Sequence, residues 1–248
     1  MISFVEKPNL PADQVKTVIC GTDDERIMNY FRRKGISVLK NSPNPYIGTA
    51  VSAHADMAVL HLGNERIIVD KNQTKLIEAL TKLDMNILTT EKNIAGEYPD
   101  DIGLNFAFCN NYVLGNFAYC DKAVLDSVNE YKKIAVKQGY CKCSVLVVAD
   151  NAIITDDSGI YKKALENGLD ALLISKGDIS LDGHPYGFIG GSSGKISKDK
   201  VVFFGDIKKH RDSEKIIAFI FKYGVSFDCT DDGELRDIGG IVPIIQQA

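Results

Sequence analysis

The sequence predicts an α/β fold, a five-bladed α/β propeller of ββαβ repeats closed by the C-terminal strand. Five segments share one order: two short apolar strands, an aspartate, an amphipathic helix, a glycine or polar break, and a further strand. The first segment lacks its leading strand, whereas the tail LRDIGGIVPII at 235–245 is typical of a strand that no helix follows. We therefore expect the tail to join the first repeat.

Each repeat passes from its strands to its helix near an aspartate. The segments and their aspartates are 17–40 with Asp23, 56–90 with Asp70, 105–139 with Asp121, 144–175 with Asp156, and 195–228 with Asp206. An aspartate is expected to cap each helix, because its carboxylate accepts hydrogen bonds from the free N–H groups at a helix start. In the second segment, apolar residues recur at helical spacing: Leu76, Ile77, Leu80 and Leu83.

Short polar turns separate the two strands of three repeats. They read LGNE at 62–65, ADNA at 149–152 and SKDK at 197–200, and each predicts a β-hairpin. Ring closure by the tail would remove unpaired sheet edges, so the sequence predicts a single domain over 1–248. The alternative is an open sheet with helices on one or both faces.

The composition is typical of a cytoplasmic globular protein. Of 248 residues, 45% are hydrophobic and 25% charged, with a net charge of −4, which does not favour nucleic-acid binding. Apolar runs such as Ser144–Val148 and Ile216–Phe221 are far shorter than the roughly 20 residues of a membrane helix. The N-terminus has no pattern of a secretory signal. Six cysteines without a CxxC pair predict buried free thiols, and neither disulfides nor a structural zinc site.

Polar residues stand at the mouth of the second repeat, where SAHADM at 52–57 precedes an apolar hairpin. On a strand, His54 and Asp56 would share one face, because side chains alternate with a period of two. Such a pair favours a polar pocket over a packed core. The stretch GGSSG, residues 190–194, precedes a strand and not a helix, so it predicts a close backbone approach to the axis and not a phosphate-binding loop.

A ring of five ββαβ units with an HxD motif, His54 to Asp56, resembles the pentein fold of the guanidino-group-modifying enzymes. These include arginine deiminase, agmatine deiminase, dimethylarginine dimethylaminohydrolase and amidinotransferase, and the sequence looks like an uncharacterised branch. The resemblance implies an axial active site with a cysteine nucleophile about two blades beyond the HxD. Cys143, in YCKCS at 140–144, has that spacing, and Cys141 is the alternative.

The resemblance implies further roles. His54 would act as general acid and base, while Asp56 would orient it or bind the guanidinium. Asp237 is the candidate for a second carboxylate, although it lies one blade beyond the expected position, which is occupied by GGSSG. The other substrate-binding candidates are Asn105, Lys142, Ser192 and Ser193.

The register leaves one question open. Aligning Ile67–Asp70 with Ile153–Asp156 makes Lys142 face the axis and turns Cys143 sideways, unless the strand starts with a bulge. A lysine in the pocket would suit an anionic or carboxylate-bearing ligand. A metal site of His54, Asp56 and Cys143 would have too few ligands and is not predicted.

Two functions follow. The first is a cofactor-free, cysteine-dependent hydrolase or transferase acting on a small guanidino or amidine compound. The second is a non-catalytic pentein module that binds a small ligand or a protein partner.

Overall fold

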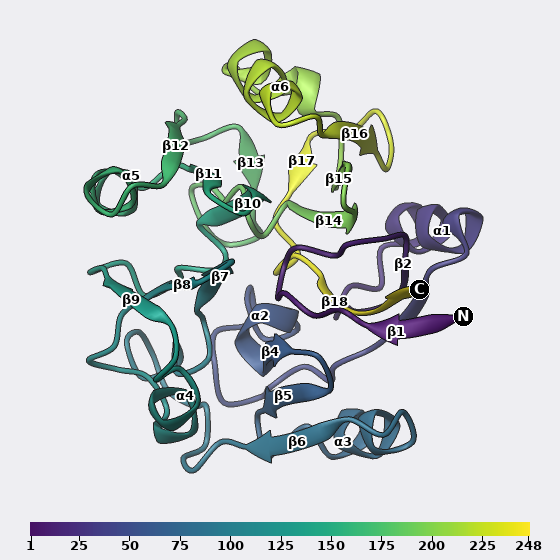
Figure 1. Ribbon diagram of the computed structural model, residues 1–248, viewed down its shortest axis with the longest axis vertical. Coiled ribbons are helices and arrows are strands. Elements are labelled where there is room, and N and C mark those ends of the chain that lie inside the picture. Colours follow the sequence, from purple (N-terminus) through teal and green to yellow (C-terminus); the bar gives the residue numbers. More distant parts are fainter.

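Five small sheets, each with a helix on its outer side, lie around a common centre (Figure 1). The computed structural model describes residues 1–248. In four of the sheets a hairpin comes first, a helix follows, and the third strand returns parallel to the second. The chain therefore has a mixed α/β fold made of small sheets.

The strands of these four sheets are short. They are β4 Val59–Gly63, β5 Arg66–Val69 and β6 Asn86–Thr89; β7 Ala107–Cys109, β8 Tyr112–Gly115 and β9 Lys132–Ala135; β10 Val145–Ala149, β11 Ala152–Thr155 and β12 Asp170–Leu173; β14 Ser193–Ser197, β15 Lys200–Phe203 and β16 Ser226–Cys229. Their helices are α3 Thr74–Thr81, α4 Lys122–Ser127, α5 Ser158–Glu166 and α6 Ser213–Lys222, with a 3₁₀ turn η1 Ile207–Lys209 before α6. The hairpins predicted at LGNE, ADNA and SKDK are confirmed by the antiparallel pairs β4–β5, β10–β11 and β14–β15.

Both ends of the chain meet in the fifth sheet, which has four strands. Its strand order is β1 Ile2–Phe4, β18 Val242–Gln247, β2 Val15–Ile19 and β3 Ser37–Leu39, with helix α1 Glu25–Lys34 between β2 and β3. The tail strand β18 pairs antiparallel with β2, the pairing expected of it. The shorter strands β13 Ile179–Ser180 and β17 Leu235–Arg236 form a separate parallel pair. No continuous hydrogen-bonded ladder runs around the ring.

Side-chain packing joins neighbouring sheets where the ladder does not. Each of the five apolar clusters draws residues from two successive sheets. The last sheet is joined to the first in this way, because Phe204 after β15 packs in one cluster with Val18 of β2 and Phe31 of α1. Burial of apolar surface between sheets therefore stabilises their arrangement around the centre.

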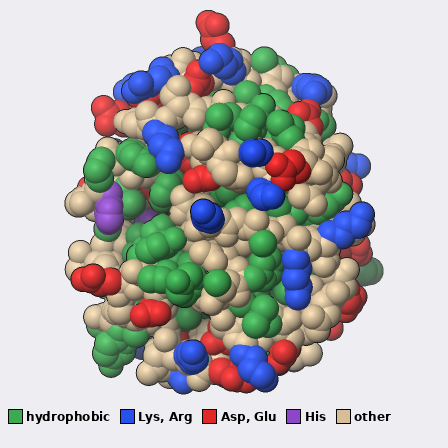
Figure 2. Space-filling view, turned by 90° about the vertical axis from the view of Figure 1, so that its left-hand side faces the viewer, with side chains coloured by type: hydrophobic (Ala, Val, Ile, Leu, Met, Phe, Trp, Pro, Cys, Tyr) green, Lys and Arg blue, Asp and Glu red, His purple; other side chains and the backbone are tan.

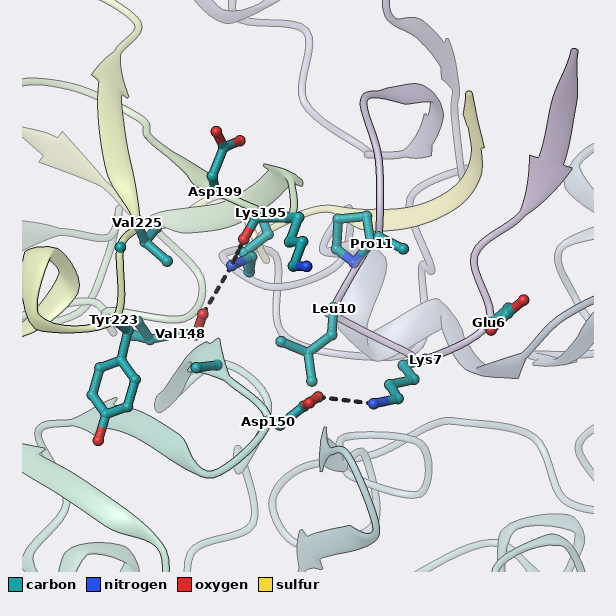
Figure 3. Close-up of a pocket in the computed structure, with 14 residues that line it drawn as sticks. Glu6, Lys7, Leu10, Pro11, Val148, Asp150, Lys195, Asp199, Tyr223 and Val225 are labelled. Atoms are coloured by element: carbon teal, nitrogen blue, oxygen red, sulfur yellow. Dashed lines mark hydrogen bonds and ion pairs between the residues drawn. The ribbon is translucent and has the colours of Figure 1, made fainter. Parts of the chain in front are cut away.

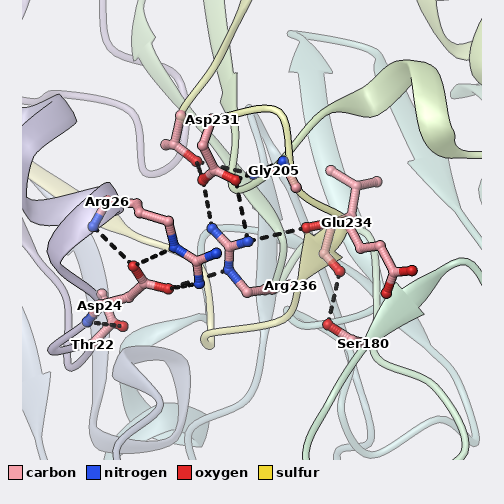
Figure 4. Close-up of polar contacts among 11 residues, drawn as sticks. Thr22, Asp24, Arg26, Ser180, Gly205, Asp231, Glu234 and Arg236 are labelled. Carbon is pink, nitrogen blue, oxygen red and sulfur yellow. Dashed lines mark hydrogen bonds and ion pairs between the residues drawn. The ribbon is translucent and has the colours of Figure 1, made fainter.

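An ion-pair network adds a polar contact between the tail and α1 (Figure 4). Arg236 lies 2.6 Å from Asp231 and 3.3 Å from Asp24, the residue that caps α1, and each of these three side chains is at most one-fifth exposed. Arg26 pairs with Asp24 at 2.6 Å. This network fixes Arg236, the residue directly before Asp237.

The predicted helix caps are only partly right. Asp121 caps α4, and its carboxylate accepts a hydrogen bond from the Ala123 N–H. The caps of α1 and α5 are Asp24 and Asp157, one residue after the predicted Asp23 and Asp156. Neighbouring residues of an extended chain point to opposite sides, so Asp156 is buried while Asp157 turns to the helix.

The other two repeats also depart from the predicted caps. Asp70 is buried before α3, whose N-cap residue is Gln73. Asp206 caps only the 3₁₀ turn η1, and α6 begins after Asp212. In both repeats several residues turn the chain between the strand and its α-helix, so the strand-end aspartate lies too early to cap it.

Asp156 makes stability dependent on pH. Burial raises the pKa of its carboxyl to about 7, against the opposing charge of Lys176, and Oδ1 has no hydrogen-bond partner. The folded protein therefore holds this proton more tightly than the unfolded chain, and stability is lost as the pH rises from about 4 to about 7. Asp156→Asn is expected to raise the free energy of unfolding by about 1–3 kcal/mol at pH 8 and by much less at pH 4.

Urea unfolding of the unaltered protein and of Asp156→Asn, each at pH 4 and pH 8, measures this difference in the free energy of unfolding. The exposed Asp182→Asn is the control and should change stability equally little at both. A gain for Asp156→Asn that does not depend on pH would contradict the proposed effect of the charge.

None of the helices has the length and apolar content that a membrane span requires. On the face drawn in Figure 2, lysine and arginine side chains are scattered among acidic and hydrophobic ones. No large area of a single charge covers that face.

Candidate active site

Cys143 lies in a buried turn directly before β10. The turn is closed by a hydrogen bond from the Ser144 N–H to the Tyr140 carbonyl, and Cys143 is 2% exposed. Its Sγ donates to Oδ2 of Asp56 at 2.9 Å. The thiol is thus held directly against a carboxylate.

Asn105 fixes this turn from the neighbouring repeat. Its Oδ1 accepts hydrogen bonds from the N–H groups of Lys142 and Cys143, at 2.7 and 3.3 Å. Its Nδ2 lies 3.2 Å from the Cys143 Sγ and 3.2 Å from the Asp56 carbonyl oxygen. The side chain is 1% exposed, so Asn105 positions Cys143 and Asp56 relative to each other.

The HxD motif lies at a helix start and not on a strand, which corrects the expectation from side-chain alternation. His54 precedes the single helical turn α2, Ala55–Ala58, and Asp56 belongs to that turn. Even so, one possible ligand atom from each of His54, Asp56 and Cys143 lies within 4.8 Å of the other two. The three side chains form one buried cluster.

Asp237 completes the cluster from the tail. Its Oδ1 lies 3.8 Å from Nδ1 of His54 and accepts a hydrogen bond from the Gly239 N–H, while Oδ2 accepts one from the Phe188 N–H. The backbone at Gly191 runs so close that a Cβ there would lie 1.9 Å from Oδ1. Part of GGSSG therefore makes the close backbone approach expected of it, and it does so against the Asp237 carboxylate.

Two candidate binding residues are not brought to this cluster, and a third, Lys142, approaches Asp56 from outside the larger cavity. The hydroxyls of Ser192 and Ser193 both donate to the Ile189 carbonyl and are fully buried. Lys142 lines two small spaces with Asn9, from the arm between β1 and β2. Cys143, and not Lys142, lines the larger cavity, because residues 140–144 form a turn in which strand alternation does not apply.

A cavity of about 430 Å³ opens above the cluster. His54, Cys143 and Asp237 line its buried part. The other side chains around it are mostly aromatic or acidic: Glu97, Tyr98, Asp101, Tyr140, Tyr186 and Phe188. No periodic pattern singles out Glu97, Tyr98 and Asp101, although their loop between β6 and β7 is long enough to suggest a functional segment.

The electrostatics of the cluster favour a neutral thiol. Burial raises the pKa of Asp56 to about 6, although His54 and Lys142 oppose the shift. Burial, with the nearby carboxylates of Asp56 and Asp237, raises the pKa of the Cys143 thiol well above its ordinary value. Without a bound cation the Cys143 thiol therefore keeps its proton and donates a hydrogen bond to Asp56.

The sequence matches the model of a family of unknown function (DUF6873) over residues 18–242. The chain belongs to this family. No curated protein matches it in sequence.

Solved structures show what the fold of this DUF6873 protein resembles. An inosamine-phosphate amidinotransferase from Streptomyces griseus matches with a TM-score of 0.59 and 10% identity, over 99% of this chain and 98% of the other. A dimethylarginine dimethylaminohydrolase from Pseudomonas aeruginosa matches with a TM-score of 0.57 and 12% identity, over 92% and 96%. An agmatine deiminase from C. jejuni matches with a TM-score of 0.54 and 12% identity, over 93% of this chain and 91% of the other. The resemblance to the pentein superfamily is thereby confirmed for the fold.

The DUF6873 chain has a second large cavity, of about 490 Å³, beside the N-terminal arm (Figure 3). Buried Lys195 lines it and donates to the carbonyls of Val148 and Lys198, at 2.8 and 2.6 Å. Burial lowers the pKa of this lysine to about 8. The lining contains no cysteine or histidine, so the pairing of a thiol with an imidazole occurs at the first cavity.

Proposed function

We propose that the protein is a cofactor-free, cysteine-dependent hydrolase or transferase of a small guanidino or amidine compound. In this proposal residues 1–248 form one pentein domain, whose five sheets are the blades of a propeller closed by β18. The observation that carries it is the contact of Cys143 with Asp56, beside His54, where Cys143 and His54 line one cavity. The pentein fold supports it, because the structural neighbours include amidinotransferase, deiminase and dimethylaminohydrolase enzymes.

A guanidinium in the cavity would bind against the carboxylate of Asp237, whose oxygens match its N–H donors, with the Asp56 carboxylate behind the Cys143 thiol. His54 takes the thiol proton, and the Cys143 sulfur attacks the guanidinium carbon. His54 then gives that proton to the departing nitrogen as the C–N bond breaks, which leaves an amidino group on sulfur.

The second half of the reaction decides between hydrolase and transferase. In hydrolysis, His54 removes a proton from water, the hydroxide attacks the same carbon, and the C–S bond breaks to give a ureido product. In a transferase, an acceptor amine replaces water and carries the amidino group away. In both cases the thiol regains its proton, so the cycle needs no redox cofactor.

The bound cation also supplies the driving force for ionising the thiol. In the free protein the thiol donates to Asp56, the charge of Asp237 also disfavours the thiolate, and a guanidinium bound beside them offsets this negative charge. The thiolate then forms only when a substrate is present to react with it.

This charge effect predicts how fast Cys143 reacts with iodoacetamide. Asp56→Asn removes the carboxylate in contact with the thiol, so the pKa of the thiol falls and the thiolate fraction at pH 8 rises, about tenfold for each pKa unit. Alkylation of the peptide containing Cys143, followed by mass spectrometry, is expected to be several-fold to tenfold faster in Asp56→Asn than in the unaltered protein. Asp100→Asn, an exposed change, is the control and leaves the rate unaltered. Equal or slower alkylation in Asp56→Asn would contradict the assignment of Asp56.

Turnover tests the proposal itself. The purified protein is incubated with a panel of guanidino and amidine compounds, with and without an acceptor amine and a chelator, and ammonia, amine and ureido products are measured. Chelator-resistant turnover of at least one compound is the expected result. An absence of turnover across the panel, together with no alkylation of Cys143 at any pH below unfolding, would favour the non-catalytic binding module.

A further inference from the structure

The cavity beside Cys143 is lined by negative charges, whereas the sequence predicted a positive charge from Lys142. No lysine or arginine lines it, whereas three carboxylates do: Glu97, Asp101 and Asp237. Lys142, the cation that would have favoured an anionic ligand, faces the arm and not the cavity. A ligand carboxylate would therefore be repelled here.

Asp101 is a buried carboxylate that the proposed reaction does not use. It is 3% exposed, and its Oδ2 accepts a hydrogen bond of 2.7 Å from the Tyr140 hydroxyl. Its Oδ1 is buried and has no hydrogen-bond partner. A buried carboxylate oxygen without a donor is costly, and a ligand with N–H groups would satisfy it.

Asp101 makes no hydrogen bond or ion pair with the residues of the Cys143 cluster. The Cys143 thiol donates to Asp56, and Asp237 lies 3.8 Å from Nδ1 of His54. Asp101 instead contacts Tyr140, which comes three residues before Cys143 at the other end of the turn. The cavity thus offers one acidic position beside the nucleophile and a second one beside Tyr140.

Aromatic rings surround the second position. The ring of Tyr140 lies 5.5 Å from that of Tyr98 and 6.4 Å from that of Phe188, and Phe188 lies 6.0 Å from Tyr186. Faces of such rings attract alkylated or primary ammonium groups. Lys176 lies over Tyr186, with Nζ 5.3 Å from the ring centre, but it does not line the cavity. No lysine or arginine therefore lines the cavity beside Asp101, and the two histidines in its lining are His54 and His184.

We propose that Asp101, with the rings of Tyr98, Tyr140 and Phe188, is a second cation subsite. The substrate class that fits both positions is a guanidino compound whose other end is an amine and not a carboxylate. This inference rests on the proposed function for the guanidino end and goes beyond it by specifying the other end.

Binding to Cys143→Ala protein, measured by calorimetry, tests the subsite without turnover. The probes are guanidinobutylamine, butylguanidine and guanidinobutyrate, with their shorter and longer homologues, and butanediamine beside butylamine. Guanidinobutylamine is expected to bind about tenfold more tightly than butylguanidine, and guanidinobutyrate more weakly than both.

Variants assign that preference to Asp101. Asp101→Asn, made in the same background, should bring guanidinobutylamine and butylguanidine to nearly equal affinity while leaving butylguanidine unchanged. Tyr140→Phe keeps the ring and removes the hydroxyl donor, so the preference for the amine should persist. The adjacent exposed Asp100→Asn is the matched control and should behave like the parent. Thermal unfolding checks that each variant is folded.

The outcomes distinguish a failure of the subsite from a failure of the proposed function. If butylguanidine binds but the amine end adds nothing, or if the carboxylate binds best, the cation subsite is overturned while the proposed function stands. If butanediamine binds more tightly than butylamine and no guanidino compound competes with it, the subsite stands and the proposed function fails. If none of the probes binds, both are overturned.

Discussion

Replacing Cys143 with alanine is expected to lower kcat/KM for any guanidino substrate by at least about a thousandfold. The reason is that no other thiol lies in the cavity: Cys143 is the single cysteine in its lining. Alanine removes the atom that forms the covalent intermediate and leaves the carboxylates that bind the cation in place. The KM or Kd of the substrate should therefore change far less than kcat does.

Cys141→Ala is the matched control, two residues away in the same turn. Cys141 is fully buried and packs in the apolar cluster that contains Ala107, Val145 and Ile153. Its replacement should cost some stability, about 1 kcal/mol, and leave kcat near that of the unaltered protein. Full activity in Cys143→Ala, or a selective loss of kcat in Cys141→Ala, would overturn the assignment of the nucleophile.

Much of the fold was predictable because its repeats carry local signals. The hairpin turns between β4 and β5, β10 and β11, and β14 and β15 contain Asn, Gly or Asp at the positions where tight turns need them. The tail strand β18 was predictable from an imbalance, since one repeat lacked a strand and the chain end supplied one. The helix starts were less predictable, because two adjacent aspartates, as at Asp156 and Asp157, are both plausible caps until burial distinguishes them.

The site was predictable only where spacing along the chain reflects the repeat. His54 and Cys143 were singled out by such spacing, and the structure brings them into one cluster. The direction of Lys142 was not predictable, because a turn replaces the strand register at 140–144. Asp101 gave no signal, since it lies in an irregular loop and its role depends on a hydrogen bond from the distant Tyr140.

Gly239→Ala is expected to have the second largest effect, because the tail passes directly against the HxD motif. Gly239 has φ of +75°, and a Cβ at this position would lie 2.3 Å from the His54 Cβ and 2.5 Å from its Cα. Alanine therefore meets both a backbone penalty and a clash with a fixed helix start. We expect a loss of about 2–4 kcal/mol in the free energy of unfolding, measured with urea.

Gly224→Ala separates the two causes. Gly224 has a similar φ, +68°, but a Cβ there has no atom within 4 Å, so only the backbone penalty of about 1 kcal/mol applies. Equal losses in the two variants would mean that the contact with His54 does not matter.

If Gly239→Ala loses more unfolding free energy than Gly224→Ala, we expect it also to lose activity at temperatures where it is still folded. Relief of the clash must move His54 away from the tail, and the Gly239 N–H is also one of the donors that hold Asp237. His54, Asp56 and Cys143 come from two different repeats and Asp237 from the tail between β17 and β18, so the cluster is complete only when the tail packs against the other repeats. The tail that carries the closing strand therefore also completes the candidate site, and Gly239 is where stability and activity should fail together.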